Sequence, residues 1–441
     1  MTTDRIRVGV VSLGCDKNRV DTENMIGFLC RDFEVVNDYA DADVVIINTC
    51  AFIESAVKES IDVIMEAASH DVKLIVTGCL PMRYPQIAKD GLLPEVSAFL
   101  DNHHYTTIAE TIYNILEGGR EVRVNTEVMP VPTSVDRVLT TPMHYAYLKV
   151  AEGCNNRCAF CAIPAIRGPY VSTPVATLEA ETRRLADAGV REFILVAQDV
   201  TRYRDGDVDL LGLLDRLEAA GAETIRLMYC YPEQVTEALI MRIEQDSHLA
   251  PYIDVPMQHA SDAVLRRMRR RSTQAGLESM MSYIRDHTHI RVRSTFMVGF
   301  PGETEEDVDA LVAFLERYRP EYAGFFAFSP EEGTPAAEWE QVPAKVRKQR
   351  LRRVEAVQSR IMREIAEGYV GQTIVVCLDR LDYDRNCFVG HAVWMHPEID
   401  NKVYFGADFP VETGRTYRVR VDRVSKLDLV GTALGSDEDG R

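Results

Sequence analysis

Three closely spaced cysteines, Cys154, Cys158 and Cys161, constrain this 441-residue chain more than any other feature. Their C-x3-C-x2-C spacing puts three thiols on one short loop, with no fourth cysteine or histidine close by in the sequence. A structural zinc site needs four ligands, so a zinc knuckle fits poorly; it and a chance grouping are the alternatives. A [4Fe–4S] cluster is normally held by four thiolates, and three of them would leave one iron open to a ligand. The loop therefore predicts an iron–sulfur cluster with a free coordination position.

Length and composition narrow the class of protein. A chain of this length predicts two to four domains. It has no apolar run long enough to span a bilayer and no signal-peptide core in its first 15 residues, so we expect a cytoplasmic protein without membrane contact. Ten cysteines then favour metal binding or catalysis over disulfides. A net charge of −18 argues against a generalised nucleic-acid binder and is compatible with a basic protein or a ribonucleoprotein as partner.

The amino-terminal third alternates strand and helix patterns. Buried-strand patterns cover residues 6–13, 44–47 and 73–77, and helical patterns cover residues 21–31 and 53–69. This alternation predicts a parallel sheet flanked by helices.

A cysteine follows each of the three predicted strands: Cys15, Cys50 and Cys79. Ligands of open α/β sheets bind at the carboxyl ends of the strands, so we expect the three thiols to converge there. Buried cysteines that act as small apolar residues are the alternative. The shared position after three strands favours a second metal cluster, again with one open iron. Cys30, on a predicted helix, is expected to be structural.

The middle of the chain predicts six strand–helix units, which make an open partial (β/α)6 barrel. The predicted strands are residues 145–151, 193–197, 224–229, 252–257, 292–299 and 323–329. The predicted helices between them are residues 175–188, 210–220, 234–245, 263–286 and 305–318. The working face of such a fold is built from the loops after the strands, and the first of these loops carries the three closely spaced cysteines.

Polar residues and a glycine follow several of these strands, where a cofactor would bind. The expected cofactor contacts are Gln198, Asp199, Gln258, His259, Gly299 and Glu303. Each of three has an alternative role: Asp199 as a loop cap, His259 as a buried structural histidine or proton shuttle, and Glu303 as a helix cap. Gly299 would let the backbone turn tightly or approach the cofactor.

The carboxyl-terminal segment predicts a small β-barrel. A helical pattern over residues 345–363 precedes short strand patterns at 373–378, 387–393, 403–405 and 417–422. From Gly371 onward nine Lys or Arg face twelve Asp or Glu, a net charge of −3. Cys377 and Cys387 alternate with strand residues and are expected to be structural.

Several segments resemble a known family. The loop at Cys154–Cys161 resembles the signature of radical S-adenosylmethionine enzymes. The sequence motifs around Cys15 (SLGCDKNRVDTE), Cys50 (NTC) and Cys79 (VTGCL) resemble the corresponding motifs of the methylthiotransferases within that class. So do residues 298–307 (VGFPGETEED) and 328–336 (FSPEEGTPA), while the end of the chain resembles a TRAM domain. The sequence motifs around Cys15 and at residues 396–405 (HPEIDNKVYF) are most similar to those of the branch that modifies a ribosomal protein. One difference is Asp16, at a position where members of that branch commonly have proline.

The resemblance implies the organisation of the chain. The implied parts are a Rossmann-like parallel α/β methylthiotransferase domain at 5–118, a linker at 119–139, a radical core at 140–367 and an all-β TRAM barrel at 369–436. It also implies two [4Fe–4S] clusters, held by the two cysteine triplets. S-adenosylmethionine would be both radical source and methyl donor.

The implied reaction adds a methylthio group to the β-carbon of one aspartate of small-subunit ribosomal protein S-twelve, free or within the ribosomal subunit. That carbon is unactivated, so a radical is needed to remove its hydrogen. A sulfur donor and an electron donor of the flavodoxin or ferredoxin type are implied partners.

Two alternatives stay open. A tRNA methylthiotransferase acting on a modified adenosine would share the architecture, but the mildly acidic terminal barrel lacks the basic stripe of RNA-binding domains. A non-enzymatic iron–sulfur scaffold or electron carrier would have no use for open irons.

The run RRMRRR at residues 266–271 is a concentrated positive charge on an acidic chain. It is either a solvated face or a contact for ribosomal RNA or acidic substrate. If the run contacts ribosomal RNA or an acidic substrate, charge reversal at Arg269 and Arg270 would weaken substrate capture without affecting cofactor cleavage.

Overall fold

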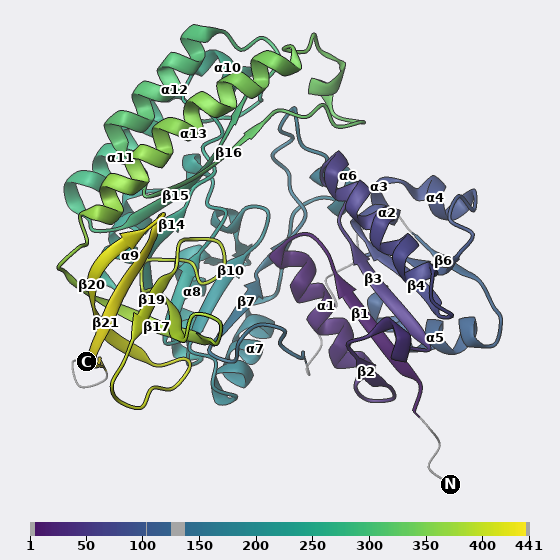
Figure 1. Ribbon diagram of the computed structural model, residues 1–441. Helices are drawn as coiled ribbons and strands as arrows, with labels where there is room; N and C mark the ends of the chain where they lie inside the picture. The colour runs from purple at the N-terminus through teal and green to yellow at the C-terminus, as the bar shows by residue number, and fades with distance from the viewer. Residues whose placement is uncertain (1–4, 103, 125–136, 438–441) are drawn as a thin grey trace.

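The computed structural model describes residues 5–102, 104–124 and 137–437 of the chain (Figure 1). An amino-terminal α/β part, drawn in purple, lies beside a central part in teal and green, and a small yellow β-barrel packs against the central part. No helix among the described residues has the length and apolar character needed to cross a membrane.

The amino-terminal part is one parallel six-stranded sheet in the order β2-β1-β3-β4-β5-β6. Its strands are β1 Arg7–Ser12, β2 Glu34–Val36, β3 Val44–Thr49, β4 Lys73–Gly78, β5 Val96–Leu100 and β6 Glu121–Arg123. Its helices are α1 Asp16–Leu29, α2 Glu54–Ala68, α3 Cys79–Arg83, α4 Pro85–Lys89 and α5 Ile108–Leu116. The predicted parallel sheet is confirmed.

Two boundaries differ from the sequence-based expectation. Helix α1 begins directly after Cys15, five residues earlier than predicted, because Lys17 and Asn18 are buried polar residues that break the apolar pattern. Strand β6 lies inside the predicted linker 119–139, where it pairs with β5 and completes the sheet. The stretch 125–136 of that linker lies outside the described residues.

The central part is an open parallel sheet in the order β16-β15-β14-β13-β10-β7, as predicted. Its strands are β7 Tyr145–Lys149, β10 Glu192–Val196, β13 Thr224–Leu227, β14 Leu249–Asp254, β15 Arg291–Val298 and β16 Tyr322–Ala327. Its larger helices are α7 Val175–Asp187, α8 Leu210–Ala219, α9 Glu237–Gln245, α10 Asp262–Arg267, α11 Gln274–His287, α12 Glu305–Tyr318 and α13 Ala344–Glu367. They cover the outer face of the curved sheet (Figure 1).

The prediction of a single helix over residues 263–286 is wrong, because the chain turns between α10 and α11. Arg269 adopts a left-handed backbone conformation with φ of 58°. Thr273 then caps the start of α11, its hydroxyl accepting a hydrogen bond of 3.1 Å from the backbone N–H of Gly276. The helical periodicity on both sides of the turn hides this break in the sequence.

The terminal part is a closed five-stranded barrel, β17-β18-β19-β21-β20. Its strands are β17 Thr373–Asp382, β18 Cys387–Ala392, β19 Val403–Gly406, β20 Thr416–Ser425 and β21 Asp428–Ser436, the last of which is not among the predicted strands. The barrel shares one apolar cluster with the inner face of the central sheet. Polar contacts fix it there: Glu398 accepts hydrogen bonds from the hydroxyls of Tyr145 (2.9 Å) and Tyr147 (2.8 Å).

Candidate active site

The cysteines of the amino-terminal part meet at one edge of its sheet. Strands β1, β3 and β4 are neighbours, and Cys15, Cys50 and Cys79 follow their carboxyl ends. Gly14 has φ of +91°, and a Cβ there would lie 2.7 Å from the Cβ of Cys50, so the loop that carries Cys15 runs directly against Cys50. Burial raises the pKa of the Cys79 thiol to about 11, and the nearby Cys15 and Cys50 thiols add to the rise.

The second triplet occupies the loop between β8 (Ala151–Glu152) and α6 (Ile163–Arg167). Cys154 and Cys158 are each 6% exposed. Burial raises the pKa of the Cys161 thiol to about 12, and the neighbouring Cys158 and Cys154 thiols contribute. The three sulfur atoms are therefore gathered at the carboxyl edge of the central sheet.

The cysteine triplets differ from a closed single-ion site in how closely their donor atoms approach one another. Tetrahedral zinc–sulfur bonds of about 2.3 Å would hold the sulfurs within about 4 Å of one another. Among the described residues, three ligand-type side chains bring donor atoms within 4.8 Å of one another in two places, and neither place includes a cysteine of the triplets.

A buried ionic network joins the two cysteine sites. Arg167, 2% exposed, donates from Nη1 to Asp21 (2.9 Å) and to Glu152 (3.0 Å). Its Nη2 lies 3.4 Å from the Sγ of Cys79 and also donates to the Asn18 amide oxygen. Lys149 binds Glu152 at 3.0 Å and pairs with Asp21 as well. Helix α6, which follows the second triplet, is thereby tied to the edge of the first sheet.

Arg270 lies next to the second triplet and not on the surface, which corrects its predicted place in an exposed basic run. It is 7% exposed, its Nη1 is 3.9 Å from the Sγ of Cys158, and its guanidinium lies 4.1 Å from the ring centre of Tyr231. Its Nη2 donates to the Pro256 carbonyl at 2.9 Å. The alternation of buried and exposed positions across the turn after α10 explains why one arginine of the run points inward.

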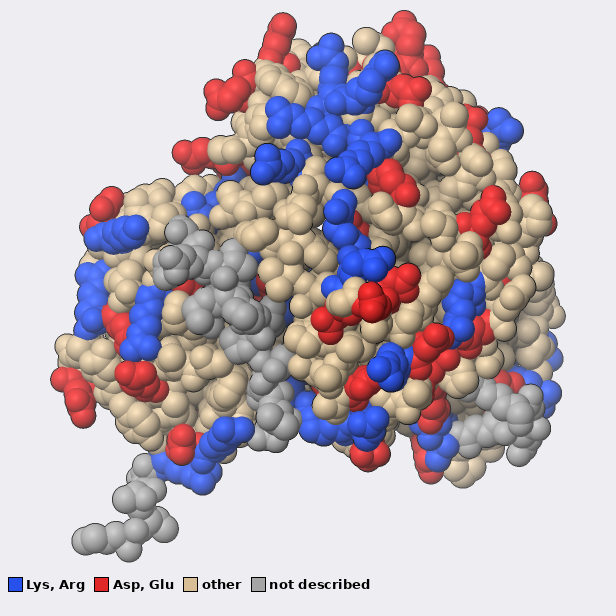
Figure 2. All heavy atoms as spheres, turned by 180° about the vertical axis from the view of Figure 1, so that it is seen from behind, with Lys and Arg blue, Asp and Glu red and all other residues tan. Residues whose placement is uncertain are grey.

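The other four arginines of that run are exposed, namely Arg266, Arg267, Arg269 and Arg271. They lie at the end of the central part where α10 and the start of α13 are found, and α13 adds exposed Lys345 and Lys348. Figure 2 shows Lys and Arg side chains gathered at this end of the back face, which is otherwise mixed in charge.

Gln198 and Asp199 lie just beyond β10. The Gln198 amide donates to Glu152 at 2.9 Å, and its buried Oε1 has no hydrogen-bond partner in the described part of the chain. Asp199 is 1% exposed and accepts from the Asn156 amide (2.9 Å) and the Thr201 hydroxyl (2.6 Å). Asp199 thus supports the loop of the second triplet through Asn156.

Gln258 and His259 follow β14. Gln258 has φ of 70°, and its Oε1 is buried and unpaired within the described ranges. His259 is fully buried, and its Nδ1 accepts from the Ser261 N–H at 3.0 Å while its Nε2 lacks a described partner. Burial lowers the pKa of His259 to about 4, which makes the ring neutral near pH 7.

Gly299 and Glu303 form one turn after β15. The Glu303 carboxylate accepts from the backbone N–H of Gly299 and, at 3.1 Å, from that of Phe300, and it pairs with Arg350 at 3.2 Å. Glu303 therefore does not cap α12, whose cap is Thr304. Gly299 has φ of +73°, and a Cβ there would lie 2.3 Å from Cγ of Arg347, so this position has no room for a side chain.

Three family models match the chain in the places that the fold defines. The Radical SAM superfamily matches residues 148–315, the uncharacterized protein family UPF0004 matches residues 7–98, and the TRAM domain matches residues 370–434. Together with the open parallel sheet of the central part and its cysteine loop, these matches define a radical S-adenosylmethionine enzyme, a class that uses an iron–sulfur cluster and S-adenosylmethionine.

Curated relatives give the family within that class. The chain is 40% identical to the ribosomal protein uS12 methylthiotransferase RimO of Desulforamulus reducens, over 96% of this chain and 98% of the relative. It is 41% identical to the protein of the same name from Moorella thermoacetica, over 97% of this chain and 99% of the relative. The chain belongs to the ribosomal protein uS12 methylthiotransferase RimO family.

Solved structures support the fold. The radical S-adenosylmethionine methyltransferase TsrM of Kitasatospora setae, solved with cobalamin and a [4Fe–4S] cluster, superposes with a TM-score of 0.51 at 17% identity. The match covers 76% of this chain and 77% of that one.

Proposed function

We propose that this radical methylthiotransferase adds a methylthio group to the β-carbon of an aspartate of ribosomal protein uS12. The observation that carries the proposal is the pair of three-cysteine sites, one at the edge of each parallel sheet, joined through Arg167. When bound, two [4Fe–4S] clusters would supply the electron for S-adenosylmethionine cleavage and a place for the transferred sulfur. Cys154, Cys158 and Cys161 would hold one cluster, and Cys15, Cys50 and Cys79 the other.

Buried polar atoms without partners support a cofactor site next to Cys154. Unpaired buried groups are rare in folded proteins and call for a ligand or a water. Gln198 Oε1, Gln258 Oε1 and His259 Nε2 are such atoms within the described ranges, and all three follow strands at the edge where the cysteine loop lies. These three residues would contact S-adenosylmethionine.

Asp199, Gly299 and Glu303 have a supporting role in this proposal. Asp199 accepts a hydrogen bond from Asn156 in the cysteine loop. The Glu303 carboxylate accepts hydrogen bonds from the Gly299 N–H and from the Arg350 guanidinium, which fixes the turn after β15. They would shape the cofactor site through these loops.

The proposal includes the partners and the domain limits. The first domain would extend to Arg123, because β6 belongs to its sheet. The electron donor would be of the flavodoxin or ferredoxin type, and the reaction would take place in the cytoplasm on uS12, free or in the ribosomal subunit.

Two single-cysteine variants test whether the two cysteine triplets have different roles in the reaction. The reconstituted protein is incubated anaerobically with S-adenosylmethionine, a reductant and small ribosomal subunits, and both 5′-deoxyadenosine and modified uS12 are measured. Cys50→Ala should still form 5′-deoxyadenosine but produce no methylthiolated uS12. Cys158→Ala should form neither product. Methylthiolation by Cys50→Ala would refute the role of the amino-terminal triplet.

A further inference from the structure

Exposed basic side chains form one surface at the end of the central part that carries α10 and the start of α13 (Figure 2). We call this the core basic surface; its members are Arg266, Arg267, Arg269, Arg271, Lys345 and Lys348. The two segments that supply it, residues 266–271 and 344–352, contain no Asp or Glu. Because the whole chain has a net charge of −18, the sign of the charge is reversed locally here.

The turn after β15 brings the two segments together. Arg267 lies against Gly302, where an added Cβ would be 2.5 Å from its Cζ. Arg347, one position before Lys348, lies against Gly299, where an added Cβ would be 2.3 Å from its Cγ. Since Gly299 and Gly302 belong to one turn, the arginine run and the first turn of α13 contact the same short stretch of chain.

The charges of the core basic surface are not used inside the protein. In the part of the chain that the structure describes, none of its six side chains forms an ion pair. Farther along the same helix α13, exposed arginines do pair with acidic residues of α12: Arg353 with Asp309, and Arg360 with Glu316 at 2.8 Å. Like charges held together repel one another and destabilise the fold, so a surface of this kind points to a partner outside the chain.

The backbone also presents one of these arginines at a cost. Arg269 has φ of 58°, in the left-handed region that favours glycine. Strained positions of this kind persist where the surrounding structure imposes them, and they cluster at sites of function.

We propose that the core basic surface binds the phosphate backbone of ribosomal RNA, so that the enzyme takes uS12 within the small ribosomal subunit and not as a free protein. This inference rests on the proposed function. A guanidinium binds a phosphate through two N–H groups, and four of the six side chains are arginines. RNA repels a chain with a net charge of −18, and a local positive surface overcomes that repulsion.

The radical core fits this role better than the terminal barrel. From Gly371 onward the chain has a net charge of −3, whereas RNA-binding domains carry a basic stripe. The RNA contact therefore falls on the core, although the TRAM domain is at the end of the chain.

The core basic surface is connected directly to the loop of the second triplet. The N–H of Ala159, in that loop, donates a hydrogen bond of 3.0 Å to the carbonyl of Met268, in the middle of the arginine run. Two positions farther on, Arg270 turns inward, and its Nη1 lies 3.9 Å from the Sγ of Cys158. RNA bound on the outside of this turn is thus held in a fixed relation to the cysteine loop, and it brings a neighbouring segment of uS12 to the same edge of the sheet.

Two double variants with the same change in charge test the surface in the cluster-loaded protein. Lys345→Glu with Lys348→Glu changes the core, and Arg418→Glu with Arg423→Glu changes exposed positions on barrel strand β20. Sedimentation with small ribosomal subunits measures binding. The core variant should bind at least about tenfold more weakly, since one phosphate contact contributes close to tenfold at about 0.1 M salt. The barrel variant should stay within about twofold of wild type.

Competition and turnover identify the partner. Small-subunit ribosomal RNA alone should displace wild type from subunits. The core variant should have a KM at least about tenfold higher for uS12 in subunits and an unchanged KM for free uS12. Wild type that does not bind subunits, RNA that does not compete, equal losses on both substrates, or equal losses in the core and barrel variants would each overturn the RNA surface. A loss seen only when flavodoxin replaces dithionite would also overturn it and assign the surface to an acidic electron donor.

Folding and the proposed function are checked separately. Formation of 5′-deoxyadenosine with dithionite should be the same in the core variant and wild type. If it falls, Lys345→Gln with Lys348→Gln decides: its affinity for subunits should fall at least about threefold, and an unchanged affinity would overturn the proposal. Subunit binding needs no turnover, so wild type that binds subunits through this surface but leaves uS12 unmodified would contradict the proposed function and support the RNA contact.

Discussion

The Nη2 of Arg167 lies 3.4 Å from the Sγ of Cys79, so a residue six positions beyond one cysteine triplet contacts a cysteine of the other. The contact belongs to a fully buried network in which Arg167 and Lys149 neutralise Asp21 and Glu152. The relative placement of the two cysteine sites therefore depends on this arginine.

Replacing Arg167 with methionine should destabilise the protein strongly. Lys149 alone would then face two buried carboxylates, and a buried pair that loses one partner costs about 3–5 kcal/mol. Urea unfolding under anaerobic conditions measures the change in the free energy of unfolding. Arg183→Met, on an exposed position of α7, is the control and should stay within about 0.5 kcal/mol of wild type. Equal losses in the two variants would contradict the structural role of the network.

The arginines of residues 266–271 should separate into two functional groups. Arg266 and Arg269 are exposed, and a double charge reversal to glutamate should raise the KM for small ribosomal subunits without changing 5′-deoxyadenosine formation. If these arginines bind phosphates, the slope of binding against log salt should fall by roughly 1 for each phosphate that the variant no longer neutralises. Titration of subunit binding at several salt concentrations measures this slope.

Arg270→Met should behave in the opposite way. Arg270 is buried beside Cys158 and Tyr231, so its loss should lower S-adenosylmethionine cleavage and leave subunit binding unchanged. The idea of two groups fails if the exposed and the buried variants impair the same step.

Burial of His259 should make stability depend on pH in the acid range. Burial lowers the pKa of His259 from 6.5 to about 4, with Arg350 lowering it further and Asp307 opposing. Between these two values the unfolded chain binds a proton that the folded protein does not. The contribution of neutral His259 to the free energy of unfolding is therefore complete above about pH 6.5. It falls by roughly 3 kcal/mol as the pH drops toward 4.

His259→Gln isolates this contribution, because glutamine does not titrate. Denaturant unfolding of both proteins at several pH values gives the difference in their free energies of unfolding. That difference should shrink in favour of the variant as the pH falls from 6.5 to 4. A difference that does not change with pH would show that His259 titrates normally in the folded protein.

Much of the fold is predictable because its elements are local and strongly patterned. The predicted bounds of helix α12 agree with the structure, since Thr304 and Asp307 form a capping box at its start. The three cysteines after β1, β3 and β4 are expected together because parallel strands end at one edge. Short β2, on the sheet edge, has too few residues for a pattern.

The buried charges are the main features that the sequence does not disclose. Arg167, Lys149 and Arg270 look like surface residues in a one-dimensional pattern, because charged side chains are almost never fully buried without partners. Glu152 is a nearby partner of Arg167 and Lys149, but their other carboxylate partner, Asp21, and the Cys158 partner of Arg270 are more than 100 positions away. Only the fold brings them together.

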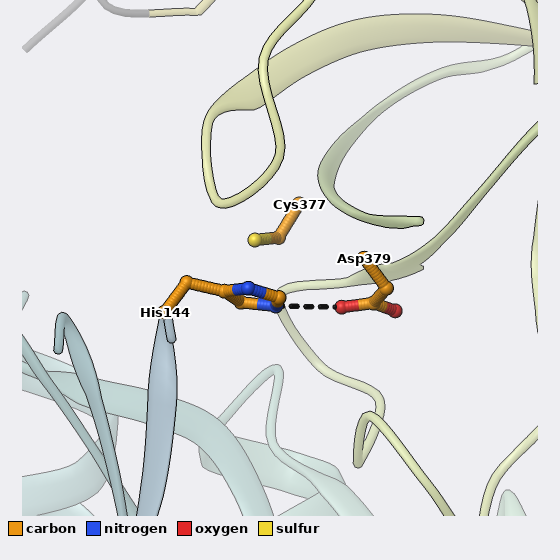
Figure 3. Close-up of side chains that lie close together, drawn as sticks. All are labelled: His144, Cys377 and Asp379. Carbon is orange, nitrogen blue, oxygen red and sulfur yellow. Dashed lines mark hydrogen bonds and ion pairs between the residues drawn. The ribbon is translucent and has the colours of Figure 1, made fainter. Parts of the chain in front are cut away.

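Strand alternation alone predicts a structural role for Cys377. His144 lies 233 positions before Cys377 in the sequence and contacts Asp379 on β17 only because the barrel docks on the core (Figure 3). Contacts between domains carry no local sequence signal.

The central claim is tested most directly by the intact mass of ribosomal protein uS12 from cells with and without this gene. The proposed function predicts one additional methylthio group, located on an aspartate, in cells that carry the gene and none in cells that lack it. An identical mass in both strains would contradict it, and a methylthio group found on tRNA adenosine from the same cells would assign the enzyme to the tRNA substrate.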